Sequence, residues 1–407
     1  MKAVSIALLA GIVGCLSVQP VLAAEGVEAK QKVLHSFGSG PDGAYLVGGL
    51  IDVNGTLYGT TIEGGASGGG TVFAADPDTG AETVLHSFGS GMDGTGPYAG
   101  LVDVKGTLYG TTYYGGTYDD GTVFALDPKT GAETVVYSFC YKHYPYCTDG
   151  DSPEANLIDE NGTLYGTTFA GGASGEGTVF ALDPNTGKEK VLHSFGNGDG
   201  EYPYASLIDL KGRLYGTTFY GGRGYGGTSD AGTVFSVDPN TGKEKVLYSF
   251  CSQQNCTDGG YPSAGLIDVK GTLYSTTNEG GTYDLGTVFA LDPSSGAETV
   301  LHSFGGGTDG AYPQAGLIDV KGTLFGTTPA GGGVNDNCLT YYSCGTAFSV
   351  DPTTGAETVA YSFCSQQNCT DGATPFASLL DVRGTLYGTT DVGGSYGGGT
   401  VFSLKRP

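Results

Sequence analysis

The hexapeptide Thr56-Leu57-Tyr58-Gly59-Thr60-Thr61 decides the fold, because it returns six more times with at most one substitution per copy. The copies are marked by Leu57, Leu108, Leu164, Leu214, Leu273, Leu324 and Leu386, at spacings of 51, 56, 50, 59, 51 and 62 residues. A motif that recurs about every fifty residues is typical of a stacked or circular repeat array. The sequence therefore predicts an architecture before it indicates any chemistry.

Each repeat contains four short segments that have the composition of β-strands. In the first repeat they run from Gly49 to Val53, Thr56 to Thr61, Gly70 to Ala75 and Glu82 to Phe88. Val, Leu, Ile, Tyr, Phe and Thr dominate these segments, and Gly, Asp, Asn and Pro separate them, as expected for strands joined by turns. With 75 Gly and no amphipathic helical run, the chain is predicted to be all-β.

The two ends of the sequence predict that the repeats close into a ring. A fourth-strand segment, Val33 to Phe37, precedes the first complete repeat, and the last repeat stops after its third strand, Gly399 to Leu404. The N-terminal strand completes the last blade in such a ring, which leaves no open sheet edge between the ends. An open solenoid requires distinct capping repeats instead, and none is evident. We therefore predict a seven-bladed β-propeller of four-stranded blades, in one domain over residues 25–407 with its repeats in 32–404.

Residues 1–24 have the pattern of a secretory signal peptide, with Lys2 before an apolar run and small residues at a cleavage site ending in Ala23-Ala24. Cys15 lies in a lipobox-like stretch, so its lipidation is the alternative; the apolar sequence that continues past it favours ordinary cleavage. No second stretch is apolar for long enough to span a bilayer. We expect a secreted or periplasmic bacterial protein without a membrane span, and a monomer.

Apart from Cys15, the cysteines form four closely spaced pairs, which are Cys140/Cys147, Cys251/Cys256, Cys338/Cys344 and Cys364/Cys369. An even count in an exported chain predicts disulfides. Zinc is the weaker interpretation, because the spacings are not Cys-x-x-Cys and most pairs lack a histidine at ligand spacing. Each bridge would close a short loop and stabilise the fold by roughly 2 kcal/mol.

The formal net charge of −24 comes largely from acidic residues at recurrent turn positions. Such a surface repels phosphate, so nucleic acid and anionic membranes are poor partners. One recurrent acid begins an Asp-Gly pair in every repeat, at Asp42, Asp93, Asp149, Asp199, Asp258, Asp309 and Asp371. We expect these side chains to bond nearby backbone, as Asp does in turns. No metal or cofactor is predicted, and Ca²⁺ at these positions is the alternative.

Several segments together resemble a known repeat family. They are Tyr-Gly-Thr-Thr, Gly-Gly, Leu-His-Ser-Phe (residues 34–37) and Gly-Thr-Val-Phe-Ala-Leu-Asp-Pro (residues 121–128). In this combination the chain resembles the tandem repeat called GloVer, found in exported bacterial proteins, over nearly all of residues 32–404. That resemblance implies a repeat and export, without an activity. The last segment also resembles quinoprotein propeller repeats, but those dock their blades with Trp, and this chain has none; the same absence argues against WD40 repeats.

The loops after the second and fourth strands are expected to share one face, because strands alternate in direction. These are also the long, variable loops, and binding sites concentrate on variable loops held by a rigid scaffold. We call this side of the ring the variable-loop face. Three acids there, Glu63, Glu279 and Asp391, are candidate catalytic residues if they converge at the central channel, since glycoside hydrolysis needs two carboxylates. The alternative is that they are solvated surface acids.

Aromatic side chains in the same loops are candidate platforms for sugar rings, because they combine an apolar face with a polar tip. They are Tyr113, Tyr114, Tyr118, Phe219, Tyr220, Tyr225 and Tyr283. The alternative is that they pack over the Gly-rich loops. Four histidines, His35, His86, His193 and His302, share one strand position with tyrosines in the other repeats, and the choice follows the type of the next loop. We interpret them as structural.

Three functions remain open. The favoured one is a non-catalytic exported propeller that binds a polysaccharide or an extracellular protein at the variable-loop face. The alternative is a secreted polysaccharide hydrolase or lyase that uses loop carboxylates and tyrosines. The third is a scaffold without a small ligand, which predicts no concave pocket. No nucleophile elbow, P-loop or His-Glu-x-x-His motif occurs.

Overall fold

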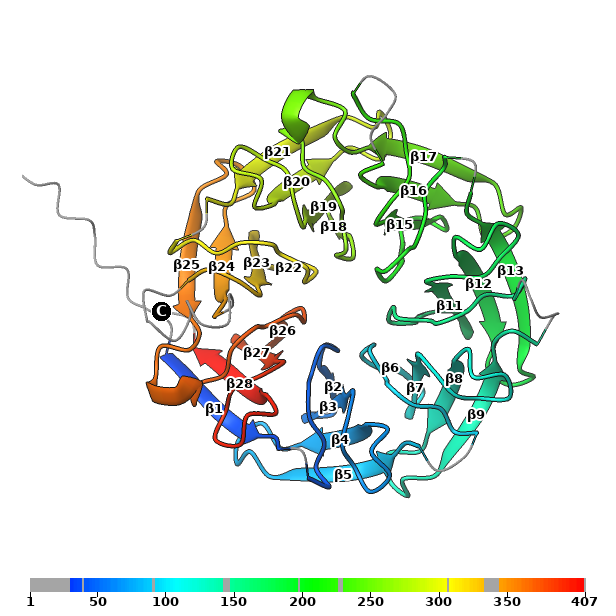
Figure 1. Ribbon diagram of the computed structural model, residues 1–407, viewed down its shortest axis with the longest axis vertical. Coiled ribbons are helices and arrows are strands. Elements are labelled where there is room, and N and C mark those ends of the chain that lie inside the picture. Colours follow the sequence, from blue (N-terminus) through cyan, green and yellow to red (C-terminus); the bar gives the residue numbers. More distant parts are fainter. Residues whose placement is uncertain are drawn as a thin grey trace, which may run out of the picture.

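A computed structural model describes residues 30–38, 40–89, 92–141, 147–196, 198–225, 230–305, 307–332 and 344–405. These residues form seven four-stranded antiparallel sheets arranged as blades around a central axis (Figure 1). The helical segments that lie entirely among them are the single-turn 3₁₀ segments η2 (Gln254–Cys256) and η3 (Gln367–Cys369). No helix in this part of the chain is long and apolar enough to cross a membrane. The predicted signal peptide and Cys15 lie outside the described residues.

The blades follow one another along the chain. Blade one contains β2 (Ile51–Val53), β3 (Thr56–Thr61), β4 (Thr71–Ala75) and β5 (Glu82–Ser87). Blade two contains β6 (Val102–Val104), β7 (Thr107–Thr112), β8 (Thr122–Leu126) and β9 (Glu133–Ser138). Blade three contains β10 (Ile158–Glu160), β11 (Thr163–Thr168), β12 (Thr178–Asp183) and β13 (Lys188–Ser194). Blade four contains β14 (Ile208–Asp209), β15 (Leu214–Thr218), β16 (Thr233–Val237) and β17 (Glu244–Ser249).

The remaining three blades complete the circle. Blade five contains β18 (Ile267–Val269), β19 (Thr272–Thr277), β20 (Thr287–Leu291) and β21 (Glu298–Ser303). Blade six contains β22 (Ile318–Val320), β23 (Thr323–Thr328), β24 (Thr346–Val350) and β25 (Glu357–Ser362). Blade seven contains β26 (Leu380–Val382), β27 (Thr385–Thr390), β28 (Thr400–Lys405) and, from the other end of the chain, β1 (Lys30–Ser36).

The predicted closure of the ring is confirmed. β1 pairs antiparallel with β28, from Lys30 opposite Lys405 to Ser36 opposite Thr400. The first strand of every blade is innermost, beside the channel, and the fourth is outermost (Figure 1). Residues on the channel side therefore come from the first strand and from the segment that enters it.

The hairpin turns explain much of the acidic composition. Between β2 and β3, Asn54 and Gly55 both have positive φ, 57° and 87°, as the sequence predicts for a two-residue hairpin turn. The Asp52 side chain accepts a hydrogen bond of 2.9 Å from the Gly55 amide. In the turn after β4, the Asp76 carboxylate accepts bonds from two backbone amides, which lower its pKa. These acids hold the turns of the face opposite the variable loops.

Phenylalanine and threonine dock the blades where other propellers use tryptophan. The Phe37 ring, after β1, lies 5.0 Å from the Phe73 ring of the next blade. The equivalent pair recurs at every blade junction with ring centroids 4.9–5.2 Å apart. At six of the seven junctions a buried threonine hydroxyl also donates to a backbone carbonyl of the next blade, as Thr60 does to Ala99 at 2.8 Å.

The outer rim carries a repeated contact between a histidine or tyrosine and the aspartate of the Asp-Gly pair. The His Nε2 and Asp Oδ2 atoms are 3.0–3.5 Å apart in the four histidine repeats. Tyr137, Tyr248 and Tyr361 donate their hydroxyls to the equivalent aspartates at 2.6–2.7 Å. Six of these aspartates also accept hydrogen bonds from backbone amides of the loop after the fourth strand. The structural interpretation of the histidines and the backbone-bonding interpretation of the aspartates agree with these contacts.

A buried or partly buried glutamate at the start of the next outer strand faces six of these seven contacts. Burial and, for most, a neighbouring aspartate raise the pKa of five of them to about 7; they are Glu82, Glu133, Glu244, Glu298 and Glu357. In blade seven the position is taken by Gln31, whose side-chain amide donates to the Asp371 carbonyl. Glutamates with raised pKa values and one glutamine thus line the rim between blades.

Candidate functional site

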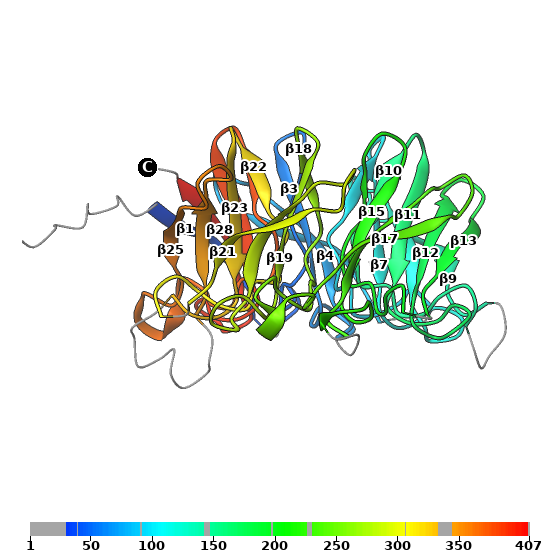
Figure 2. The same ribbon diagram turned by 90° about the horizontal axis from the view of Figure 1, so that it is seen from above.

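The variable-loop face is assembled by short β-bridges between its two kinds of loop. In each blade, the segment that follows a fourth strand pairs with the loop between the second and third strands, as Ala44 does with Glu63. Figure 2 shows these loops gathered at one end of the ring, away from the short hairpins. Three predicted disulfides, Cys140–Cys147, Cys251–Cys256 and Cys364–Cys369, are present on this face. Cys344 is disulfide-bonded, and Cys338 lies outside the described residues.

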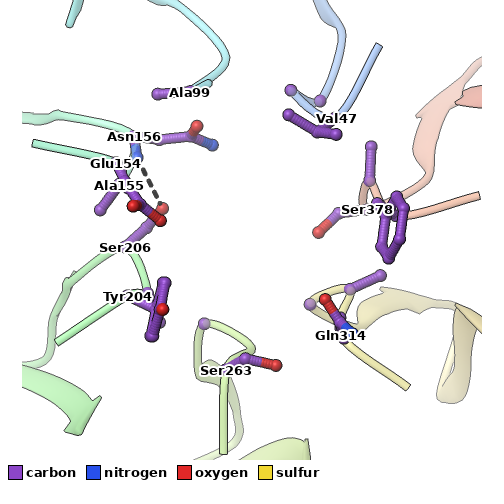
Figure 3. Close-up of a pocket in the computed structure, with 18 of the residues that line it drawn as sticks. Val47, Ala99, Glu154, Ala155, Asn156, Tyr204, Ser206, Ser263, Gln314 and Ser378 are labelled. Carbon is purple, nitrogen blue, oxygen red and sulfur yellow. Dashed lines mark hydrogen bonds between the residues drawn. The ribbon is translucent and has the colours of Figure 1, made fainter. Parts of the chain in front are cut away.

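At the centre of this face, one residue from each blade lines a cavity of about 300 Å³. We call this set the channel-mouth ring; its members are Val47, Tyr98, Glu154, Tyr204, Ser263, Gln314 and Phe376. Figure 3 shows Val47, Glu154, Tyr204, Ser263 and Gln314 around the common opening. Below the ring the channel narrows to backbone and small side chains such as Ala155, Asn156 and Ser206.

The repeat itself explains why these seven side chains meet. In six blades each follows a proline and precedes an alanine, a small residue and a leucine, as in Pro153-Glu154-Ala155-Asn156-Leu157. The alanine and leucine are buried, each less than 5 % exposed in blade three, and they anchor the segment. Because this segment enters the innermost strand, the residue between proline and alanine lies at the channel.

Glu154 is the one carboxylic acid of the ring. No described residue donates a hydrogen bond or forms an ion pair with its carboxylate, and burial alone raises its pKa to about 7. The Glu154 carboxylate in turn contributes to the raised pKa values of Tyr98, Tyr113 and Tyr204, after the larger effect of burial. Glu154 therefore lies among these three phenols, in a half-desolvated site at the channel.

Aromatic rings continue outward from the channel over blades two to five. Tyr98 contacts Tyr113 at 5.3 Å, and Tyr113 contacts Tyr114 at 4.4 Å between ring centroids. On the other side of Glu154, Tyr204 lies 4.9 Å from Phe169 and 5.2 Å from Phe219. With the rings that touch these, the aromatic belt consists of Tyr98, Tyr113, Tyr114, Phe169, Tyr202, Tyr204, Phe219, Tyr220 and Tyr261.

The predicted aromatic residues divide into two groups. Tyr113, Tyr114, Phe219 and Tyr220 belong to the aromatic belt, and Tyr114 is 50 % and Tyr220 38 % exposed. The remaining three lie outside it and are highly exposed; they are Tyr118, Tyr225 and Tyr283. Tyr118 contacts Tyr141 beside the first disulfide, and Tyr283 lies against Gly305.

Two of the three predicted carboxylates lie together. Asp391, in blade seven, is half-buried, and burial followed by repulsion from Glu63 in blade one raises its pKa to about 6. Both carboxylates also act on Tyr98, so this pair lies near the channel-mouth ring. Glu279 is in blade five, where it interacts with Asp284 and Tyr261 instead.

A second hollow of about 600 Å³ adjoins the channel mouth at blade seven. Phe376 lines both cavities, and Asp391, Thr374 and the Cys364–Cys369 disulfide complete the second one. The Thr374 hydroxyl is buried and has no hydrogen-bond partner among the described residues. The concave surface is therefore larger than the channel mouth alone.

Metal-ligating side chains do not gather at the channel mouth in the described part of the chain. One group of potential ligands includes the disulfide-bonded Cys140 and Cys147 with Asp120, and the other is His193, Asp199 and Glu244 on the outer rim. The channel-mouth ring supplies a single carboxylate, Glu154, whereas a Ca²⁺ site needs several oxygen ligands from one compact region.

The channel-mouth ring was missed by the sequence analysis, because the candidate residues all come from the loop after the second strand and none from the segment that follows the fourth. A usable signal exists, because the position between proline and alanine changes in almost every repeat while its neighbours hardly do. Variation inside a fixed motif marks a position that the fold does not dictate.

The sequence matches a known repeat family over nearly its whole length. The family model of the Gloeobacter/Verrucomicrobia repeat matches residues 24–225, 142–257 and 218–402. No curated protein matches the sequence. Among solved structures, an oligogalacturonate lyase in complex with manganese is 13 % identical with a TM-score of 0.55, and 93 % of each chain is covered. The oligogalacturonate lyase from Vibrio parahaemolyticus is 9 % identical with a TM-score of 0.52, over 94 % of this chain and 98 % of the other.

An extracellular domain from B. thetaiotaomicron, assigned to a one-component system, is 12 % identical with a TM-score of 0.57. The match covers 93 % of this chain, which spans only 40 % of the length of that protein. At these identities the likeness shows the propeller fold alone.

Proposed function

The chain belongs to the Gloeobacter/Verrucomicrobia repeat family, and from that premise we propose that it is an exported, non-catalytic carbohydrate-binding propeller. The ligand is a glycan that enters the channel mouth and lies along the aromatic belt. The observation that carries the proposal is the channel-mouth ring, where one side chain from each blade lines a common cavity and its identity varies although the flanking residues repeat. A scaffold without a ligand has no need of such a cavity.

The composition of the ring suits a sugar. Tyr98, Tyr204 and Phe376 offer aromatic faces, while Glu154 and Gln314 offer hydrogen-bonding groups. Sugar rings have apolar C–H faces and a polar perimeter, so they bind where aromatic surface and a few polar groups converge. The cavity of about 300 Å³ is at the small end of the range for ligand sites. It suits one or two sugar units, with the rest of a longer chain outside.

Export is part of the same proposal. The disulfides form and persist in oxidising compartments. The signal-peptide pattern of residues 1–24 and the extracellular domain among the similar folds support it. The protein acts as a monomer in this proposal, outside the cytoplasm, on a polysaccharide or its fragments.

The test is binding of an oligosaccharide panel by isothermal titration calorimetry with the mature, oxidised protein. Tyr204→Ala removes a ring from the channel mouth and is expected to weaken binding about tenfold, because one aromatic contact contributes about 1 kcal/mol or more. Tyr283→Ala removes an exposed ring outside the aromatic belt and serves as the matched control. Equal effects of the two substitutions, or no binding to any glycan, would contradict the proposal.

A polysaccharide hydrolase or lyase is the second candidate, and the raised pKa values of two carboxyl groups favour it. With a pKa of about 7, Glu154 is poised between acid and base near neutral pH, as a general acid or base must be. Asp391, with a pKa of about 6, is the other carboxyl near the cavity. Products released from a polysaccharide by the wild type but not by Glu154→Gln would establish this alternative.

A further inference from the structure

The cationic residues are distributed unequally between the two faces of the ring. Among the described residues, Arg223 is the only lysine or arginine in a loop of the variable-loop face. The others lie in or beside the turns of the opposite face; for example, Lys105 is in a hairpin turn and Lys32 donates to Asp78 in another. A ligand that approaches the channel mouth therefore meets little positive charge.

Negative charge is concentrated at the channel mouth. Glu154 lines the channel-mouth cavity, and Asp391 lines the adjoining hollow that shares Phe376 with it. Glu63 is close enough to Asp391 to raise the pKa of that carboxyl. A cavity lined by one sign of charge focuses the field and favours ligands of the opposite sign. Anionic sugars such as uronates are disfavoured here.

Glu154 is the group that lacks a partner. Its side chain is partly buried, and no described side chain or amide donates to its carboxylate. A buried charge without a partner is costly, and a ligand that supplies a cationic hydrogen-bond donor removes that cost. Tyr98 and Tyr204, on either side, add ring faces that also attract a cation.

Resting on the proposed function, we propose that the glycan bound at the channel mouth is an amino sugar whose free ammonium group pairs with the Glu154 carboxylate. The aromatic belt contacts the faces of the sugar rings, and the ammonium group selects among glycans of the same shape. An N-acetylated sugar of the same backbone lacks the cation, and a uronate places a second negative charge in the cavity.

Three tetrasaccharides test the inference by calorimetry at pH 6.5, namely those of glucosamine, N-acetylglucosamine and galacturonate. The wild type is expected to bind the glucosamine tetramer at least about tenfold more tightly than the N-acetylated one, because a charge-assisted hydrogen bond is stronger than a neutral one. Galacturonate is expected to bind least. Glu154→Gln, which keeps the shape of the side chain, is expected to abolish the preference for the free amine.

The control variant is Glu176→Gln, which removes a carboxylate of the same blade outside the channel mouth; the preference is expected to persist. A second readout is the proton released when the ammonium pairs with Glu154, measured in buffers of different ionisation enthalpy. It is expected in the wild type and in Glu176→Gln, and not in Glu154→Gln.

Equal binding of the glucosamine and N-acetylglucosamine tetramers overturns the amino-sugar inference and leaves the proposed function standing. The same holds if Glu154→Gln keeps the preference. Equally tight binding of tetralysine overturns the inference in favour of a cationic peptide. Failure to bind any of these sugars or any neutral glycan overturns both proposals.

Discussion

Two threonines at equivalent positions make a matched experiment on how the blades are held together. Thr60 and Thr111 are both buried, 2 % and 1 % exposed. The Thr60 hydroxyl donates to the Ala99 carbonyl of the next blade at 2.8 Å. The Thr111 hydroxyl is buried without a hydrogen-bond partner among the described residues. Substitution by valine keeps the shape of either side chain and removes only the hydroxyl.

The two substitutions are expected to change the free energy of unfolding in opposite directions. Thr60→Val removes a hydrogen bond and leaves a buried carbonyl without that donor, which costs about 1–2 kcal/mol. Thr111→Val replaces a desolvated, unpaired hydroxyl by a methyl group, so the free energy of unfolding is expected to stay the same or to rise by up to about 1 kcal/mol. The two variants should therefore differ by about 2 kcal/mol.

Urea unfolding followed by tyrosine fluorescence and far-ultraviolet circular dichroism measures the difference. The slope of the free energy of unfolding against urea concentration should be the same in both variants, because the surface exposed on unfolding is unchanged. If both substitutions destabilise equally, or if Thr111→Val is the more harmful, then the threonine hydrogen bond is not what docks neighbouring blades. The reasoning about the junctions would then fail.

Three further results are expected. The pKa of Glu133 is raised to about 7 by burial and by Asp93, so the folded state holds the proton more tightly than the unfolded one. The contribution of Glu133 to stability is therefore fully present below about pH 4.5 and is lost as the pH rises through 7, and Glu133→Gln should flatten this fall in a series of urea midpoints. A pH-independent difference between the two proteins would contradict it. Phe88→Ala removes a fully buried ring at the junction of blades one and two and should cost about 3–5 kcal/mol in the same assay; a loss below 1 kcal/mol would show that the ring pair does not dock the blades. Replacing Cys140 and Cys147 together by serine opens a loop with a sequence separation of 7 and should cost about 2 kcal/mol, while the circular dichroism spectrum stays unchanged; loss of the β-sheet signal would show that this bridge holds more than its loop.

The strands, the turns and the closed ring could be predicted because each is encoded locally. A turn such as Asn54-Gly55 needs positive φ wherever it occurs, and its chemistry reports the hairpin directly. The fourth strand that lies at the N-terminus can also be identified from its own residues, because the sequence around Val33 matches the other fourth strands. Three of the four cysteine pairs follow from spacing alone.

The variable position between proline and alanine can be found in the sequence, but its place in the ring cannot be predicted from any local pattern. Whether Glu154 faces the channel or the outer rim depends on which strand of the blade is innermost, and the order of four antiparallel strands reads the same from either edge. The packing of the blades decides it, through the seven Phe pairs that join a fourth strand to the third strand of its neighbour. Some predicted aromatic residues of the loop after the second strand do belong to the aromatic belt. The reason is that Tyr113 and Phe219 contact Tyr98 and Tyr204, which lie in the segments that enter the innermost strands.

The pairing of β1 with β28 has a consequence for how the molecule is made. β1 has no partner strand until β28 has been synthesised and brought beside it. Until then the free edge of β1 can pair with other chains. Contacts that join the two ends of a long chain also form slowly, because the whole intervening loop must first be brought together. Six blades can assemble as the chain emerges, whereas the seventh is the last event of folding. Errors in maturation should therefore accumulate as open rings, or as pairs of molecules that have exchanged their first strands.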